Sequence, residues 1–133
     1  MVKIGIVGSR RRDTEADFEK VKAVFAQLRE KYDGDVVIVS GGCPKGADQF
    51  AERLARELGL SIAVWPVNMD AVNKAKARGI YWRTAFGQEA YKRNRRIAGD
   101  CDELIACVAA DRRGGTENTI GYVMGLGKPV HLC

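Results

Sequence analysis

Hydrophobic residues along this chain alternate between short continuous runs and longer stretches in which they recur every third or fourth position. Short apolar runs bounded by glycine, proline or polar residues predict β-strands, and the wider spacing predicts amphipathic helices. The expected strands cover residues 2–8, 36–39, 61–65, 103–108 and 129–132, and the expected helices cover residues 18–32, 47–58, 88–98 and 116–126. Strands and helices therefore follow one another in alternation.

One stretch, residues 67–86, has no clear period and carries many polar side chains. We expect a long surface connection here, with a short helix around residues 70–77. Connections of this length usually carry a function or are disordered. Tyr81, Trp82 and Phe86 leave two interpretations open, because they either cover the domain's own core or form an apolar interface with a second copy of the chain.

The alternation also predicts the fold class. Parallel strands joined by right-handed helical crossovers form an open sheet with helices on both faces. The chain has 133 residues, of which 46% are hydrophobic, and this suits a single domain over residues 1–133. We expect an α/β, Rossmann-like, mainly parallel five-stranded sheet with a strand order of about 3-2-1-4-5. Such sheets bind ligands beyond the carboxyl ends of their strands.

Composition and charge narrow the function classes. Lys and Arg number 22 against 17 Asp and Glu, and the formal charge of +5 suits a nucleotide, a nucleic acid or solubility alone. No apolar run approaches the roughly 20 residues of a membrane span, and the N-terminal run is too short for a signal peptide, so we expect a cytoplasmic protein without a membrane partner. The cysteines show no C-x-x-C spacing and His131 has no ligand-like neighbour, so we expect neither a metal site nor a cofactor.

Three strand-to-helix turns at the expected ligand edge contain glycine. The first, Gly8-Ser9-Arg10, allows a tight turn into a helix whose first backbone amides have no intrahelical acceptor and can bind an anion. Arg10 follows the strand end, where it can contact a phosphate. We expect Arg11 and Arg12 to be solvated loop residues.

The second turn contains Gly41, Gly42, Lys45 and Gly46 and leads into Asp48. Gly41 and Gly46 have the spacing of a Walker phosphate loop, but Ala-Asp stands where that motif needs Lys followed by Ser or Thr, which argues against a P-loop NTPase. The turn still suits a phosphate or a ribose. Asp48 could cap the amides of its own helix or accept a ribose hydroxyl, and the sequence leaves both interpretations open.

The third turn offers the amides of Gly114, Gly115 and Thr116 together with the Thr116 hydroxyl. In the helix before the fourth strand, Arg93 and Asn94 lie at the margin that faces inward. Three such turns in one small domain predict a single anion-binding pocket at the carboxyl edge of the sheet.

The chain resembles the SLOG superfamily in four segments within residues 2–130: Ile-Gly-Ile-Val-Gly-Ser-Arg, Ser-Gly-Gly-Cys-Pro-Lys-Gly-Ala-Asp, Arg-Asn-x-x-Ile and Gly-Gly-Thr. This Rossmann-like group includes the Lonely Guy phosphoribohydrolases and the DNA-processing protein DprA. The chain is most similar to its small, single-domain YpsA-related branch, found in bacteria and phages. The resemblance implies a nucleotide or nucleotide-derived ligand, with its phosphate at Gly41, Gly42 and residues 114–116, and a dimer or higher homo-oligomer.

Two Lonely Guy motifs bear on catalysis. These enzymes cleave the N-glycosidic bond of nucleoside 5′-monophosphates with an Arg from Arg-Lys-x-x-Met and a Glu from Pro-Gly-Gly-x-Gly-Thr-x-x-Glu. By resemblance Arg93 is the counterpart of that Arg, whereas Thr119 stands at the Glu position. Glu117 lies about 200° around a helix from that position and is no direct substitute. A carboxylate would have to come from Glu89, Asp48 or Glu117.

Three functions remain open. The first is a nucleotide-binding module that senses or sequesters its ligand. The second is a hydrolase or transferase acting on the N-glycosidic bond of a nucleotide, with Arg93 as its catalytic residue. The third is single-stranded DNA binding as in DprA, which the charges of residues 10–12 and 92–96 permit, although the scarcity of aromatic residues in those segments argues against it.

Overall fold

The structure, a computed structural model, describes residues 1–43 and 46–133, and its strands form one parallel sheet. The strands are β1 (Val2–Gly8), β2 (Val36–Ser40), β3 (Ile62–Val64), β4 (Glu103–Cys107) and β5 (Val130–Leu132), and the helices are α1 (Glu15–Lys31), α2 (Ala47–Leu58), α3 (Met69–Ala77), α4 (Trp82–Asp100) and α5 (Gly115–Gly125). The strand order is β3-β2-β1-β4-β5, with every neighbouring pair parallel. The predicted fold class and strand order are confirmed.

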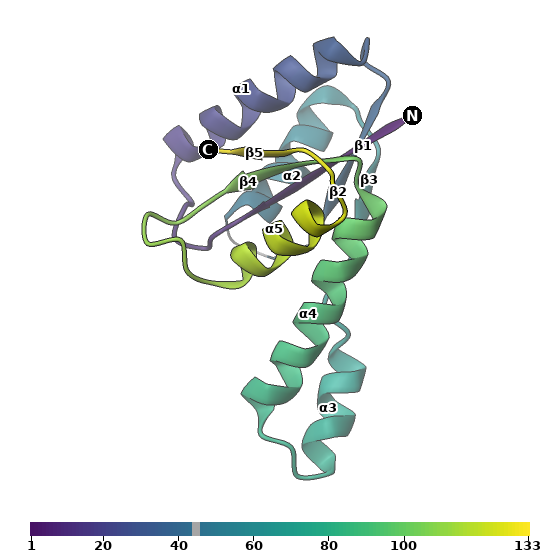
Figure 1. Cartoon of the computed structure of the whole chain (residues 1–133), viewed down its shortest axis with the longest axis vertical. Helices are drawn as coiled ribbons and strands as arrows, with labels where there is room; N and C mark the ends of the chain where they lie inside the picture. Colours follow the sequence, from purple (N-terminus) through teal and green to yellow (C-terminus); the bar gives the residue numbers. More distant parts are fainter. Residues whose placement is uncertain (44–45) are drawn as a thin grey trace.

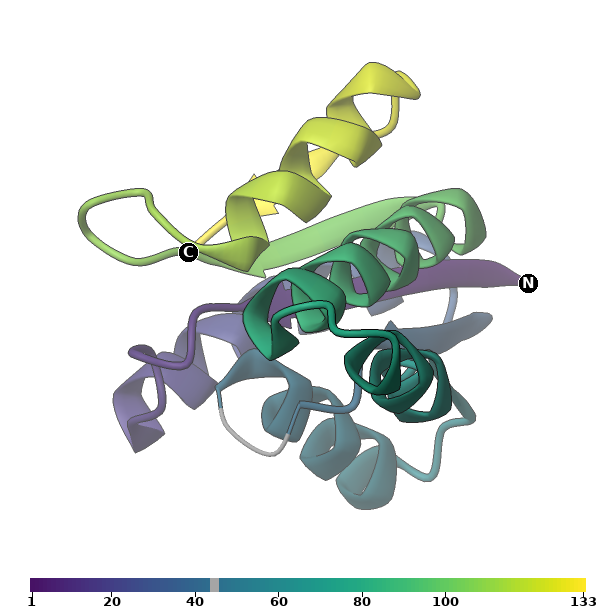
Figure 2. The same ribbon diagram turned by 90° about the horizontal axis from the view of Figure 1, so that it is seen from below.

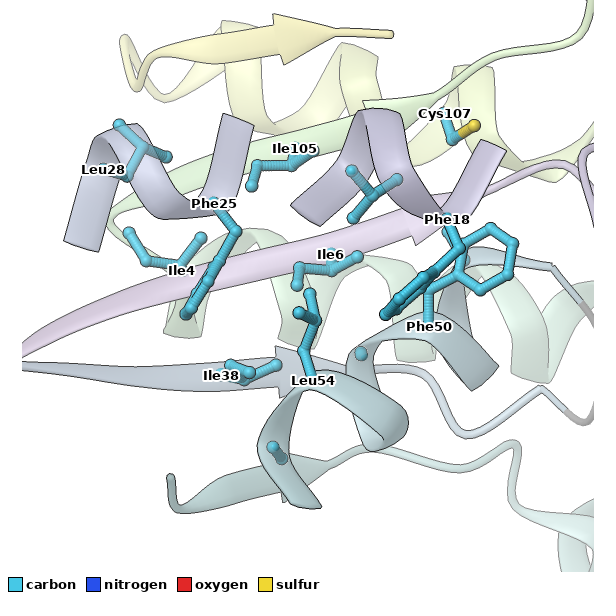
Figure 3. Close-up of a cluster of buried hydrophobic side chains, with 14 of the residues drawn as sticks. Ile4, Ile6, Phe18, Phe25, Leu28, Ile38, Phe50, Leu54, Ile105 and Cys107 are labelled. Atoms are coloured by element: carbon cyan, nitrogen blue, oxygen red, sulfur yellow. The ribbon is translucent and has the colours of Figure 1, made fainter. Parts of the chain in front are cut away.

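Helices cover both faces of the sheet (Figure 1, Figure 2). α1 and α2 pack on one face, and α4 and α5 pack on the other. The central strand β1 serves both, because successive side chains of a strand point to opposite faces. Ile4 and Ile6 join Phe18 and Phe25 of α1 in one buried cluster, shown in Figure 3, whereas Val7 belongs to the cluster under α4 and α5. Two apolar layers thus hold the sheet.

Local signals determine where the helices begin and end. The hydroxyl of Thr14 accepts a hydrogen bond from the amide of Asp17, and the Asp17 carboxylate accepts one from the amide of Thr14, so that the two residues form a capping box at the start of α1. α2 ends at Gly59, whose φ of 65° is left-handed. Thr and Gly are residue types typical of these two cap positions.

The stretch at residues 67–86 differs from the expected surface connection. The short helix is present as α3, but α4 begins at Trp82, inside the stretch assigned to a loop. α3 and α4 pack against each other, and Figure 1 shows them extending away from the sheet as one arm, here called the α3–α4 arm (residues 67–100). Its own buried cluster is small, with Val72, Ala75 and Ala85 at the centre, and this explains why the hydrophobic period is weak here.

The carboxyl ends of β1, β2 and β4 lie at the same edge of the sheet, because the three strands are parallel neighbours. Gly8 at the end of β1 pairs with Cys107 at the end of β4. The three glycine-containing turns therefore start close together. In the part of the chain that the structure describes, no helix has the length and apolarity that crossing a membrane requires.

Candidate functional site

A cleft of about 450 Å³ opens at the carboxyl edge of the sheet. Pockets for small molecules usually have volumes of about 300–1,000 Å³. The turn after β1, one side of α4 and the turn into α5 form its walls. Most of the residues expected at the site line it: Gly8, Ser9, Arg10, Asp48, Arg93, Asn94, Gly114, Gly115 and Thr116.

The turn after β1 brings Gly8, Ser9 and Arg10 to the cleft. Position 8 has no room for a side chain, because a Cβ there would lie 2.6 Å from the Cβ of Ala47 and 2.8 Å from the carbonyl oxygen of Cys107. The amide of Ser9 donates to that same carbonyl at 2.9 Å. Arg10 is exposed, and within the described residues no hydrogen bond or ion pair engages its guanidinium. The turn therefore contributes a cation to the cleft, while the amide of Ser9 is used within the protein.

The turn into α5 presents an open helix N-terminus. Gly115 and Thr116 begin the helix without a side-chain cap, and in the described part of the chain their amides donate no hydrogen bond to the protein. A Cβ built on Gly114 or Gly115 would meet no atom within 4 Å, so the space around them is open. Arg113 lines the cleft beside them. Free amides and the helix dipole make this end of α5 a favourable place for an anion.

Arg93 and Asn94 lie on the cleft side of α4, as their helical spacing predicts. Arg93 donates through Nη1 to the carbonyl of Gly41 at 2.8 Å and through Nε to Oδ1 of Asn94 at 2.9 Å. Asn94 is buried and donates to Oδ1 of Asn118 at 3.0 Å and to the carbonyl of Gly115 at 3.5 Å. This chain of hydrogen bonds connects the end of β2 to the start of α5 and orients the Arg93 side chain.

The turn after β2 reaches the cleft through Cys43, and three of its expected glycines lie outside the cleft lining. Gly41, Gly42 and Gly46 do not line the cleft. The amide of Gly42 donates to Oγ of Ser40 at 3.2 Å, and the amide of Gly46 donates to Oδ1 of Asp13 at 3.0 Å. These amides are used within the protein, so this turn does not offer them to a ligand.

Asp48 organises the same turn. Its carboxylate accepts a hydrogen bond from the amide of Cys43 at 2.9 Å. The carboxylate also leaves no room for a side chain at Gly41, where a Cβ would lie 3.0 Å from it and 2.6 Å from Nη1 of Arg93. Burial raises the pKa of Asp48, against the opposing effects of the Cys43 amide and the Arg93 charge. Asp48 thus holds the preceding turn and also lines the cleft. Lys45, expected at the site, lies outside the described residues.

The other carboxylates considered for catalysis lie elsewhere. Thr119, which the resemblance placed at a glutamate position, is buried and lines the cleft without a carboxylate. Glu117 forms two hydrogen bonds of 2.8 Å with Arg112, and Glu89 pairs with Lys92 at 3.0 Å. Neither glutamate lines the cleft. Among the described residues that line the cleft, Asp48 is the one with a carboxylate.

The arginines after Arg10 support the fold. Arg11 makes two hydrogen bonds to the carboxylate of Asp111, at 2.9 and 2.7 Å. Arg12 pairs with Asp17 at 2.6 Å and donates to carbonyl oxygens just after β4 and β5, at 2.7 and 3.1 Å. The expectation of a solvated side chain is therefore wrong for Arg12, which ties α1 to two strand ends.

Part of the cleft wall lies outside the expected site residues. Phe86, Ala90, Tyr91 and Ile97 line the cleft from α4, at positions that share one side of a helix. The helical spacing that places Arg93 inward continues back to Phe86, which falls in the stretch expected to be a surface connection. Ala90, Tyr91 and Ile97 belong to the helix expected at residues 88–98, where their spacing is the signal for a lining role.

A second hollow of about 420 Å³ lies between the C-terminal parts of α1 and α2, against Phe25, Ala26 and Leu58. None of the expected site residues lines it. Within residues 1–43 and 46–133, no group of three or more His, Cys, Asp or Glu side chains could hold a metal ion. The cleft at the sheet edge is therefore the candidate site.

Comparison of the chain with models of protein families, with curated proteins and with solved structures finds no match. The cleft is where an open helix N-terminus, the side chains of Arg10 and Arg113 and the aromatic residues Phe86 and Tyr91 meet.

Proposed function

We propose that the protein binds a nucleotide or a nucleotide-derived small molecule in this cleft and acts as a sensing or sequestering module. The observation that carries the proposal is the start of α5, where the amides of Gly115 and Thr116 are open and where Arg10 and Arg113 line the same cleft. Amides at a helix N-terminus combined with guanidinium groups favour a phosphate. The resemblance to the SLOG superfamily supports the same ligand class.

The apolar wall of the cleft suits a base. Phe86 and Tyr91 line the cleft from α4, and aromatic rings provide stacking surfaces for nucleobases. Asp48 and Asn94 line the cleft as well and can exchange hydrogen bonds with hydroxyl groups of a ribose. We therefore assign the phosphate to the start of α5 and the base to the α4 wall.

A second candidate function is cleavage of the N-glycosidic bond. It is favoured by Asp48, a buried carboxylate with a raised pKa that lines the cleft together with Arg93. It is weakened by Thr119, because a hydroxyl does not stabilise a cationic sugar as a carboxylate does. We therefore rank binding first.

Isothermal titration calorimetry with nucleoside monophosphates, cyclic nucleotides and ADP-ribose tests the proposal. Charge-assisted hydrogen bonds contribute about 1.5–3 kcal/mol, so Arg113→Ala should weaken the bound nucleotide about tenfold or more. Arg112→Ala is the matched control, because it removes the same charge at the neighbouring position. The Arg112 side chain pairs with Glu117. We expect it to change the affinity less than threefold (roughly 0.6 kcal/mol).

The proposal would be contradicted if none of the nucleotides bound, or if the two arginine variants lost affinity equally. Free base measured by chromatography in the same samples separates the two candidate functions. Release of base that is lost in Arg93→Ala would favour the enzyme, and intact nucleotide after prolonged incubation would favour the binding module.

A further inference from the structure

The net positive charge of the chain is concentrated in one segment. The α3–α4 arm holds eight of the 22 Lys and Arg residues but only three of the 17 Asp and Glu residues, so it carries the whole formal excess of +5. Its basic residues are Lys74, Lys76, Arg78, Arg83, Lys92, Arg93, Arg95 and Arg96. The remainder of the chain is formally neutral.

The outer cations of the arm are not neutralised. Within the described residues Lys74, Lys76, Arg78 and Arg83 make no ion pair, and all four are exposed. Elsewhere in the fold several arginines pair with carboxylates, as Arg53 does with Glu15 at 2.7 Å and Arg112 does with Glu117 at 2.8 Å. Unpaired charge at the far end of a projecting element creates a positive potential that attracts polyanions.

Aromatic side chains are exposed along the same arm. Tyr81 is 61% exposed, Trp82 50% and Tyr91 53%. The guanidinium of Arg83 lies 5.5 Å from the centre of the Trp82 ring, so that a basic and an aromatic group form one surface. The apolar residues that hold the arm together are different ones, centred on Val72 and Ala75 of α3.

We propose that the α3–α4 arm binds single-stranded nucleic acid, with Lys74, Lys76, Arg78 and Arg83 contacting phosphates and Tyr81 and Trp82 stacking on bases. Cationic side chains interleaved with exposed aromatic rings are what a flexible strand with accessible bases requires. Of the two segments expected for this function, residues 10–12 lie outside the arm, and Arg11 and Arg12 are engaged within the fold. Residues 92–96 belong to the arm, but the cations proposed here come from α3 and its C-cap and from the first turn of α4.

Two other partners fit this surface less well. A second copy of the chain would bring two arms of charge +5 together, and like charges repel. A membrane surface would require a broad apolar stripe, but Val72, Ala75 and Ala85 are buried between α3 and α4. The inference does not rest on the ligand of the cleft.

Fluorescence anisotropy of labelled 20-nucleotide oligo(dT) and oligo(U) with the whole protein tests the proposal. If about four phosphates are contacted, the logarithm of the affinity should fall with the logarithm of salt concentration with a slope of about −3. Trp82→Ala removes a stacking platform without changing charge and should weaken binding at least fivefold, as about 1 kcal/mol or more per stacked base implies. A duplex of equal length should bind more weakly than the single strands.

A charge-matched pair of variants locates the surface. Arg83→Ala should weaken binding and make the salt slope shallower by about 0.7. Arg56→Ala removes the same charge from an exposed position on α2 and should leave the slope unchanged. Circular dichroism establishes that both variants fold, and calorimetry should show nucleotide binding in the cleft unchanged in Trp82→Ala.

The proposal is overturned if neither oligonucleotide binds at low salt, or if Trp82→Ala binds like the unmodified protein. Equal losses in Arg83→Ala and Arg56→Ala would also overturn it, since the effect would then be one of total charge. Binding to vesicles containing anionic lipid, or Trp82-dependent self-association in sedimentation, without oligonucleotide binding would replace the strand by another partner.

Discussion

Gly46 combines two local requirements. It precedes α2 with a φ of 74°, in the region that favours glycine, and a Cβ there would lie 2.6 Å from the carbonyl oxygen of Ser9. Gly59 at the other end of α2 also has a left-handed φ, of 65°, but a Cβ there would meet no atom within 4 Å. Comparing the two glycines therefore separates the free-energy cost of a left-handed backbone from the cost of a steric contact at the Cβ position.

We expect Gly46→Ala to destabilise the protein by about 2–4 kcal/mol, because both backbone strain and the close approach to Ser9 oppose it. Gly59→Ala should cost only about 1 kcal/mol, from conformation alone. Chemical denaturation of the two variants and the unmodified protein measures the difference. Equal losses would show that the contact between Gly46 and Ser9 is not as close as described.

At the residue scale, the sequence predicted well which positions gather at the carboxyl edge of the sheet. It predicted less well which hydrogen bonds each residue makes there. Glycine in a turn is visible in the sequence, but the direction of its amide is not. The carbonyl of Gly41 accepts a hydrogen bond from the Arg93 side chain, 52 positions later, and the amide of Gly42 donates one to the side chain of Ser40. Such contacts form only in the assembled fold, so the sequence alone does not determine whether the amides of this turn are free to bind a phosphate.

At the element scale the α3–α4 arm is where the sequence pattern was least informative. The sheet and its crossovers have long apolar stripes, because each helix there covers a strand. α3 instead packs mainly on α4, through a small cluster of Val72, Ala75 and Ala85 with partly buried neighbours. An element with so small a core should open locally before the rest of the molecule unfolds.

Val72→Ala tests this independence. Removing about two methylene equivalents from the arm's core should cost about 1.5 kcal/mol, and amide hydrogen exchange in residues 69–86 should speed up roughly tenfold. Exchange in β1 and β4 should not change. Val123→Ala, in the cluster under α4 and α5, is the control and should speed exchange in those strands. Faster exchange throughout the molecule in Val72→Ala would contradict the local character of the arm.

At the scale of the whole molecule, the alternation of strands and helices was enough to predict the sheet and its order. Right-handed crossovers and a shared carboxyl edge leave few alternatives for such a pattern. Two different surfaces result from this plan. The cleft combines the open N-terminus of α5 with one side of α4, and the outer part of the arm presents exposed cations.

The central claim is that a phosphate binds at the start of α5, and a crystal structure with a bound nucleoside monophosphate tests it most directly. We predict phosphate oxygens at roughly 3 Å from the amides of Gly115 and Thr116, with the base against Phe86 and Tyr91. A phosphate bound at any other place, or a crystal saturated with nucleotide in which the cleft holds only solvent, would contradict the account.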